Sequence, residues 1–305
     1  MLADAPNPDA AKSAAVHSTP TVSLALGGGG ARGLAHIHVI EVLDEFGIRP
    51  KLIAGSSIGA IMGAAMAAGL SGKEIRGHTL AAVGRPTEAL ARIWGLRPAT
   101  LADAWSGGLR IGQFNLERLL RAFLHPQMPE RFEELQIPLK VITADFYEQC
   151  ERVQESGSLF PALAASAALP AVFLPVRIGG RILIDGGLWN PVPFDHLVGT
   201  ADITIGVDVV GKPTGDERAI PNSIDSLYGA SQLTMRSMIA LKLKQCQPDI
   251  FLQPEVGRFR VLDFVRAKEI LDHSAGVRDD LKRALDKRLA RPSGGFSGQL
   301  SQPPT

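Results

Sequence analysis

The chain has 305 residues, of which 45% are apolar and 21% charged, and its formal net charge is +1. This composition is typical of a soluble globular protein with a substantial core. A net charge so near zero offers no general attraction to nucleic acid, so we expect no nucleic-acid partner. The two cysteines, Cys150 and Cys246, form no CxxC or Cys/His pattern, which indicates reduced thiols in the cytoplasm and no metal site.

Both ends of the chain predict disordered tails. Residues 1–20 are rich in Ala, Pro, Asp and Ser and lack the apolar core of a signal peptide, and residues 291–305 are similarly polar. A folded domain is therefore expected over residues 21–290. Residues 53–72 carry no charge and are long enough to cross a bilayer, but their Ala, Gly and Ser content favours a buried helix.

The first predicted elements alternate between strands and helices. Apolar runs at 21–26 and 51–55 predict strands, and apolar periodicity predicts helices over 31–47, 56–70 and 71–83. Strand–helix–strand order at this spacing favours a parallel sheet with right-handed crossovers. The fold class expected is therefore α/β, a three-layer α/β/α sandwich around a mainly parallel central sheet.

The rest of the chain continues this pattern. Further strands are predicted at 137–146, 181–187, 201–210 and 248–256, and further helices at 115–124, 159–169, 226–245 and 277–289. Segment 94–112, broken by Pro and Gly, is compatible with a lid and with a packed surface loop. The apolar face of helix 277–289 fits a membrane-surface helix, but its three aspartates favour a helix packed on the sheet.

A run of four glycines, residues 27–30, separates the first strand from the first helix. Gly28, Gly30 and Gly33 fit the G-x-G-x-x-G pattern of dinucleotide sites, but the next strand lacks the acid that would bind a ribose. A phosphate-binding P-loop is excluded because no Gly-Lys-Ser/Thr follows. The glycines therefore need another explanation.

The second strand ends in the sequence GSSIG, where Gly55, Ser57 and Gly59 form a G-x-S-x-G pattern. Between a strand and a helix, this pattern predicts a nucleophile elbow, with Ser57 at a helix N-terminus that favours developing negative charge. An ordinary Gly/Ser turn is the alternative. Adjacent parallel strands place their carboxyl ends side by side, so the glycine loop and the elbow would share one rim. Backbone N–H groups of the loop would then form an oxyanion hole.

A serine nucleophile requires a base. Histidines occur at 17, 36, 38, 78, 125, 196 and 273, and none follows a strand end in a motif. Asp185 does, because ILIDGG places one carboxylate between an apolar strand and Gly186 and Gly187. An ordinary carboxylate is a weak base, but burial raises its pKa, so a Ser–Asp dyad is chemically feasible. A plain Asp-Gly-Gly turn remains the alternative.

The three motifs together resemble the patatin-like phospholipase family. They are GGGARG at 28–33, GSSIG at 55–59 and DGG at 185–187, in the family's order, and ASAALPAVFLPV at 165–176 is also similar to the family's pattern. The resemblance covers residues 21 to 270. It is closest to small bacterial members of the family.

The resemblance implies a lipid acyl hydrolase of the phospholipase A, lysophospholipase or esterase type. Ser57 would form the acyl-enzyme and Asp185 would act as base, with no histidine, metal or cofactor. The remaining implied positions are the oxyanion donors Gly28, Gly29 and Gly30, the basic Arg32, which touches substrate or braces the loop, and the supporting residues Gly33, Gly55, Gly59, Gly186 and Gly187.

Several alternatives stay open at this stage. His196 or His273 would complete an ordinary Ser–Asp–His triad, and a silent site would make the protein a regulatory or binding member. Acyl transfer to an acceptor other than water would use the same acyl-enzyme. The expected partner is a lipid or acyl ester substrate, with peripheral contact at a membrane surface, and the sequence carries no signal for oligomeric state.

Overall fold

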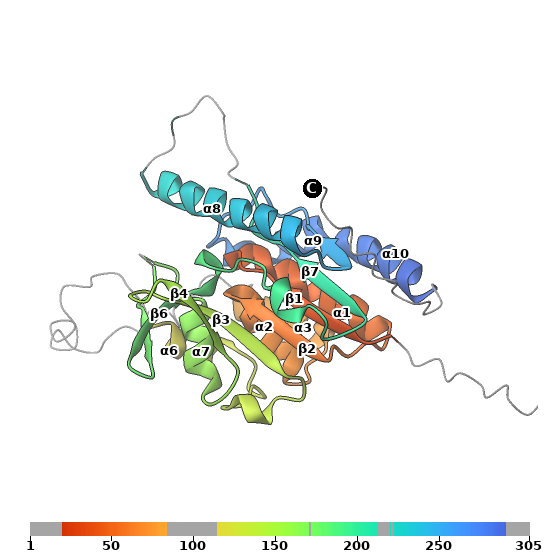
Figure 1. Cartoon of the computed structure of the whole chain (residues 1–305), viewed down its shortest axis with the longest axis horizontal. Helices are drawn as coiled ribbons and strands as arrows, with labels where there is room; N and C mark the ends of the chain where they lie inside the picture. The colour runs from red at the N-terminus through yellow and green to blue at the C-terminus, as the bar shows by residue number, and fades with distance from the viewer. Residues whose placement is uncertain (1–19, 84–114, 171, 213–219, 221–222, 291–305) are drawn as a thin grey trace, which may run out of the picture.

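The computed structural model describes residues 20–83, 115–170, 172–212, 220 and 223–290. The predicted tails, apart from residue 20, and segment 94–112 lie outside these ranges. Within them, eight strands form one mixed sheet with helices on both faces (Figure 1). The strand order is β5-β6-β3-β2-β1-β7-β8, and β4 pairs with β3. The predicted α/β/α sandwich is confirmed.

The sheet has a parallel half and an antiparallel half. The strands of the parallel half are β1 (Val22–Leu26), β2 (Leu52–Ser56), β3 (Leu139–Asp145), β7 (Ile203–Val207) and β8 (Ile250–Leu252). The strands that pair antiparallel are β4 (Cys150–Gln154), β5 (Val176–Ile178) and β6 (Arg181–Asp185). The sequence analysis missed β4 and β5. Their sequences, CERVQ and VRI, place charged residues between apolar ones, so they lack the apolar run that marks the other strands.

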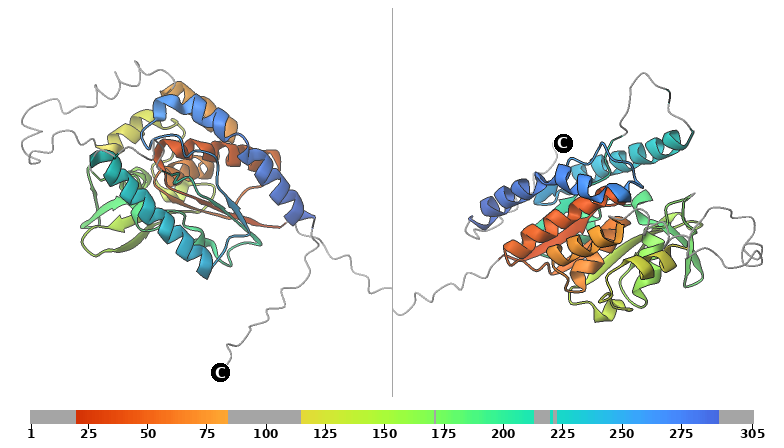
Figure 2. Two further views of the ribbon diagram at one scale, coloured as in Figure 1. Left: turned by 90° about the horizontal axis from the view of Figure 1, so that it is seen from above. Right: turned by 180° about the vertical axis from the view of Figure 1, so that it is seen from behind.

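Helices cover the two faces of the sheet unequally. The larger layer contains α1 (His36–Glu45), α2 (Ile58–Ala67), α3 (Gly72–Val83), α6 (Leu116–Phe123), α7 (Leu159–Ser166), α9 (Ala267–Ser274) and α10 (Val277–Leu289). The opposite face carries the short 3₁₀ helix η5 (Phe194–Leu197) and α8 (Ser223–Gln245) (Figure 2). Along β1, Leu24 and Leu26 face the larger layer and Ala25 faces the smaller, as strand alternation requires.

Helix α2 packs against the sheet along its whole length. All of its residues are buried, because Gly and Ala side chains allow the helix to approach the strands closely. The uncharged segment 53–72 is therefore core, as predicted. No helix among the described residues is long and apolar enough to cross a membrane.

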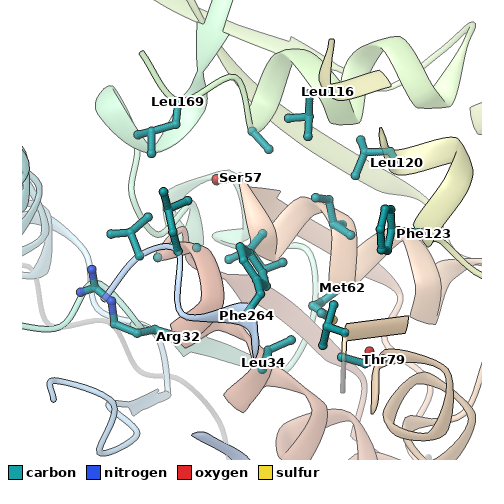
Figure 3. A pocket seen from close by; sticks show the side chains of 18 of the residues that line it. Arg32, Leu34, Ser57, Met62, Thr79, Leu116, Leu120, Phe123, Leu169 and Phe264 are labelled. Carbon is teal, nitrogen blue, oxygen red and sulfur yellow. The ribbon is translucent and has the colours of Figure 1, made fainter. Parts of the chain in front are cut away.

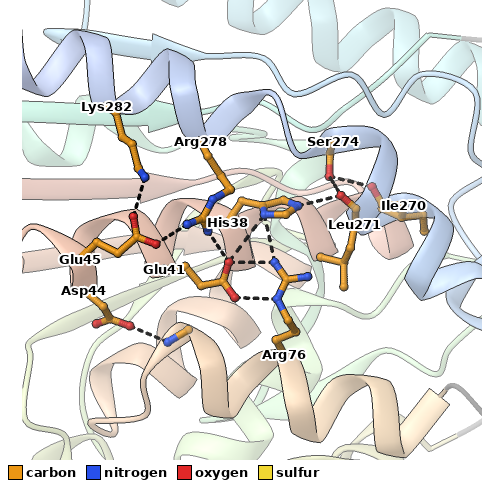
Figure 4. A network of polar contacts seen from close by, with 11 residues as sticks. His38, Glu41, Asp44, Glu45, Arg76, Ile270, Leu271, Ser274, Arg278 and Lys282 are labelled. Carbon is orange, nitrogen blue, oxygen red and sulfur yellow. Dashed lines mark hydrogen bonds and ion pairs between the residues drawn. The ribbon is translucent and has the colours of Figure 1, made fainter.

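An ion-pair network fixes α1 against α3 and α10 (Figure 4). Glu41 Oε1 of α1 lies 2.6 Å from Arg76 Nε of α3, and the same carboxylate also forms an ion pair with Arg278 of α10. His38 Nε2 is 2.8 Å from the carbonyl oxygen of Leu271 in α9. Helix α10 is thus a surface helix packed on the domain, and the predicted packing is confirmed.

Strands β2 and β6 meet end to end along one edge of β3. Strand β4 pairs with β3 from Val141 to Asp145, so β2 and β6 must share the other edge. There Ser56 lies opposite Ile142 and Asp185 lies opposite Thr143. Because β2 and β6 run in opposite directions, their carboxyl ends converge at this one point.

Candidate active site

Ser57 occupies a strained turn between β2 and α2. Its φ of 54° and ψ of −125° are rarely adopted by a residue with a side chain. The turn is also closely packed: a Cβ on Gly59 would lie 2.1 Å from the carbonyl oxygen of Leu26, and one on Gly55 2.5 Å from the Cα of Ala60. The glycines of the motif thus have a steric function, and the turn has the geometry of a nucleophile elbow.

Ser166, at the end of α7, holds the elbow in place. The Ser57 N–H donates to Ser166 Oγ at 2.9 Å, and the Ser166 hydroxyl donates to the carbonyl oxygen of Ile142 at 2.6 Å. Ser166 is fully buried. The backbone at Ser57 is therefore tied to β3 at the junction where β2 and β6 meet.

Asp185 lies directly across this junction from Ser57. The Ser57 hydroxyl donates to Asp185 Oδ2 at 2.7 Å, and the other carboxylate oxygen accepts the Gly187 N–H at 2.8 Å. The two residues are only 8% and 5% exposed. A Cβ on Gly186 would lie 2.0 Å from the Ile142 carbonyl oxygen, so only glycine lets the turn after Asp185 pack against β3.

Burial raises the pKa of Asp185 from about 3.8 to about 6, although its hydrogen bonds from Ser57 and Gly187 oppose the rise. The carboxylate is thus a stronger base than an exposed one and is still mostly ionised near neutral pH. It is able to accept the Ser57 proton at the pH where such an enzyme would work.

The two histidines considered as triad members are engaged elsewhere. His196 Nε2 is 2.8 Å from Glu151 Oε1, and the His273 ring packs edge-on against Phe259. Among the described residues, no histidine is hydrogen-bonded to Ser57 or Asp185.

The glycine-rich loop lies beside the elbow. The Gly28 N–H donates to the Pro191 carbonyl at 2.9 Å, so it is already satisfied. Gly29 and Gly30 line the same cavity as Ser57, and their N–H groups have no acceptor among the described residues. Gly30 has a φ of +59°, and a Cβ there would lie 2.2 Å from the Val261 carbonyl oxygen, so the position requires glycine.

Two buried side chains, those of Arg32 and His36, hold this loop in place. The Arg32 guanidinium donates to the Val210 carbonyl, and burial lowers its pKa to about 10. Burial also lowers the pKa of His36 to about 4, so the neutral ring donates from Nε2 to the Gly27 carbonyl at 2.8 Å. Residues Gly30–Ala35, which include the buried Arg32, form a 3₁₀ turn, η2. The helix predicted over 31–47 is therefore α-helical only from His36.

Two residues after the Asp-Gly-Gly turn bind both the end of β2 and the glycine-rich loop, and no sequence pattern indicated this role. The Asn190 carbonyl accepts the Ser56 hydroxyl, while the next carbonyl, of Pro191, accepts the Gly28 N–H. The Asn190 side chain is itself held by Glu151 and Lys242. No motif around Asn190 predicted this role, because its partners are distant in sequence.

An apolar cavity of about 380 Å³ extends from Ser57 between α2, α3 and α6 (Figure 3). Ser57 and Asp185 contribute to its wall, and Leu116, Leu120 and Phe123 lie along it away from the nucleophile. Met235 of α8 also lines the cavity. Among the described residues, no three His, Cys, Asp or Glu side chains are grouped as metal ligands.

Comparison with known proteins identifies relatives of this chain. It is 37% identical over 207 residues to an uncharacterized NTE family protein of Mycobacterium tuberculosis, covering 67% of this chain and 54% of that protein. It is 31% identical over 214 residues to neuropathy target esterase sws of Drosophila melanogaster, covering 68% of this chain and 14% of that protein. The chain thus spans about half the length of the mycobacterial relative.

Among solved structures, VipD from Legionella pneumophila is similar with a TM-score of 0.48 and 14% identity, over 89% of this chain and 67% of that one. Human GIVD cytosolic phospholipase A2 is similar with a TM-score of 0.39 and 11% identity, over 89% and 60% of the two chains. The model of the patatin-like phospholipases matches residues 24–198, more than half of the chain, and the protein belongs to that family.

Proposed function

We propose that this protein is a serine hydrolase that cleaves acyl esters of lipids through an acyl-enzyme on Ser57. The observation that carries the proposal is the 2.7 Å hydrogen bond from the Ser57 hydroxyl to Asp185, at the wall of an apolar cavity. A nucleophile paired with a base beside an apolar cavity fits cleavage of an acyl chain from an oxygen.

In the proposed reaction, Asp185 takes the hydroxyl proton as Ser57 Oγ attacks the ester carbonyl carbon. The carbonyl oxygen becomes an oxyanion, which the free N–H groups of Gly29 and Gly30 stabilise. Collapse of the intermediate breaks the bond to the leaving alcohol, which receives the proton from Asp185. Water, deprotonated by Asp185, then attacks the acyl-enzyme. The bond between the acyl carbon and Ser57 Oγ breaks, Ser57 Oγ takes the proton back from Asp185, and the fatty acid is released.

Gly28 is one of the three glycines first expected to donate to the oxyanion. Its N–H is bound to Pro191, so we assign it a packing function instead. A Cβ at Gly28 would lie 3.3 Å from the Ser57 Cβ, so a side chain there would crowd the proposed nucleophile. Gly33 packs in the same way against Ile58.

The cavity indicates one acyl chain as the bound group. A cavity of about 380 Å³ lies within the range of ligand pockets, roughly 300 to 1,000 Å³, and its apolar wall suits one alkyl chain. Its predominantly apolar lining favours an acyl chain over a charged headgroup. We therefore infer that the headgroup stays outside, at a membrane surface where the enzyme acts peripherally.

The test is hydrolysis of p-nitrophenyl esters and of a phospholipid by the purified protein, with labelling by an alkyl fluorophosphonate. We expect ester cleavage and a covalent phosphonate on Ser57, located by peptide mass spectrometry, because an activated serine attacks phosphorus. Ser57→Ala should abolish both. A folded wild-type protein that neither cleaves an ester nor reacts with the probe would instead favour the silent, ligand-binding alternative.

Ser166→Ala is expected to lower kcat about 10- to 100-fold with KM changed less than about twofold, because the buried Ser57 N–H loses its acceptor and the elbow loses its fixed position. Ser166→Thr retains a hydroxyl and should recover part of the rate. Ser274→Ala is the matched control, since Ser274 is equally buried but bonds only within α9. Equal effects of the two alanine variants on kcat would contradict a positioning function for Ser166.

A further inference from the structure

A short segment between β8 and α9 forms one side of the cavity opening. Val261, Leu262, Phe264 and Val265 line the cavity, and Figure 3 shows Phe264 inside it. Leu262 and Val265 are also 48% and 57% exposed, so their side chains face the cavity and solvent at once. The segment thus presents an apolar edge where a ligand would enter.

The same segment is positively charged on its outer side. Arg258, Arg260 and Lys268 are exposed and make no ion pair among the described residues. The two carboxylates within residues 258–269 are already occupied: Asp263 accepts the Arg260 backbone N–H at 2.8 Å and pairs with Arg266, and Glu269 also pairs with Arg266. Three cationic side chains therefore remain available to an external anion.

The segment also touches the catalytic machinery. The Ala31 N–H donates to the Val261 carbonyl at 2.7 Å, next to the proposed oxyanion donor Gly30. Anything bound to Leu262 and Val265 therefore lies beside the opening of the cavity that contains Ser57.

We propose that residues 258–268 dock the protein on the surface of an anionic lipid bilayer, with Leu262 and Val265 inserted among the lipids and Arg258, Arg260 and Lys268 at the headgroup phosphates. Apolar side chains flanked by basic ones are the composition of an interfacial anchor. The proposal rests on the proposed lipid substrate: a chain that leaves the bilayer here would meet only the apolar edge on its way to Ser57. Position at the opening favours a bilayer over a protein partner.

The test uses the full chain with Ser57→Ala, so that vesicle lipids are not consumed. Sedimentation with vesicles of phosphatidylcholine and phosphatidylglycerol, three parts to one, should show binding that weakens in high salt and in pure phosphatidylcholine. Arg258→Gln with Arg260→Gln should lower the affinity for the anionic vesicles about 25-fold, at about fivefold for each charge. Leu262→Ser with Val265→Ser should lower it at least about tenfold.

Two matched controls test the location. Leu233 and Leu241 of α8 do not line the cavity and are 71% and 57% exposed, so Leu233→Ser with Leu241→Ser should leave vesicle binding unchanged. Arg283→Gln with Lys287→Gln on α10 should also leave it unchanged. An equal loss of vesicle affinity in the control variants and the test variants would overturn the proposal. So would a lack of binding to either vesicle, or vesicle binding that the test variants do not weaken.

Separate experiments distinguish a failure of the docking proposal from a failure of the proposed function. In the protein with Ser57 intact, Arg258→Gln with Arg260→Gln should leave hydrolysis of a soluble butanoate ester unchanged while vesicle hydrolysis falls. Ester hydrolysis without vesicle binding would refute docking and leave the enzyme assignment standing. Vesicle binding without any hydrolysis would refute the enzyme assignment alone.

Discussion

Asp185→Asn is expected to lower kcat for ester hydrolysis by about 10³-fold or more, because an amide accepts no proton from Ser57. The amide retains the size of the carboxyl group. Its oxygen is able to accept the Gly187 N–H, while its NH₂ group donates to the Ser57 hydroxyl oxygen. His196→Ala combined with His273→Ala is the control and should leave kcat within about twofold, since neither ring contacts the dyad. Loss of activity in the histidine variant, with its fold intact by circular dichroism, would support a Ser–Asp–His triad instead.

The pH profile gives a second measure of the same group. Because the pKa of Asp185 is raised to about 6, kcat/KM of the wild type should rise with pH through about 6 and then level off. An exposed aspartate would place that inflection near pH 4. The measurement is kcat/KM on a soluble ester from pH 4 to 9, and an inflection near 4 would show that the buried carboxylate is not the titrating base.

Asp185→Asn should also stabilise the protein. A carboxyl group with a pKa of about 6 when folded and about 3.9 when unfolded destabilises the fold when ionised, by about 2 to 3 kcal/mol above pH 6, and not at all below pH 4. Asparagine is neutral throughout. Asp185→Asn should therefore raise Tm at pH 8 by about 4 to 8 °C and leave it unchanged at pH 4. A lower Tm at pH 8 would indicate that the charge is compensated in the folded state.

The parts of the fold that are predictable from sequence depend on local patterns. The strand–helix alternation around Gly28 and Ser57 determines two parallel neighbours, β1 and β2, and the structure pairs them as expected. Small residues in α2 explain its burial in the same local way. Asp185 stood out because a carboxylate followed by two glycines ended an apolar strand.

Features that arise from long-range pairing were not predictable. The meeting of β2 and β6 at β3 depends on an antiparallel register, and no periodicity within 181–185 encodes its direction. Ser166 accepts from Ser57, 109 residues away, and Asn190 from Ser56, 134 residues away, so their neighbours in sequence carry no sign of it. The distinction between Gly28 and Gly29 as donors depends on one carbonyl, that of Pro191.

Under the proposed function, Ala65→Phe is expected to lower hydrolysis of long-chain esters selectively, with hydrolysis of short-chain esters retained. Ile58, Ile61, Met62 and Ala65 line the cavity along α2, and Ala65 lies about 12 Å beyond Ser57 at the helical rise. A phenyl ring there would fill the distal cavity and leave the part next to the nucleophile open. Each methylene excluded from an apolar site costs about 0.8 kcal/mol, so loss of four of them lowers kcat/KM for a hexadecanoate ester about 10²-fold.

The internal control for Ala65→Phe is hydrolysis of a butanoate ester, whose chain is too short to reach Ala65, and which should stay within about twofold of wild type. Ala81→Phe, on the exposed side of α3, adds the same ring outside the cavity and should alter neither substrate. Unchanged hexadecanoate hydrolysis by a folded Ala65→Phe protein would place the acyl chain on another path. Because α2 both begins at the nucleophile and forms the cavity wall, a selective loss would tie chain-length preference to the helix that the elbow initiates.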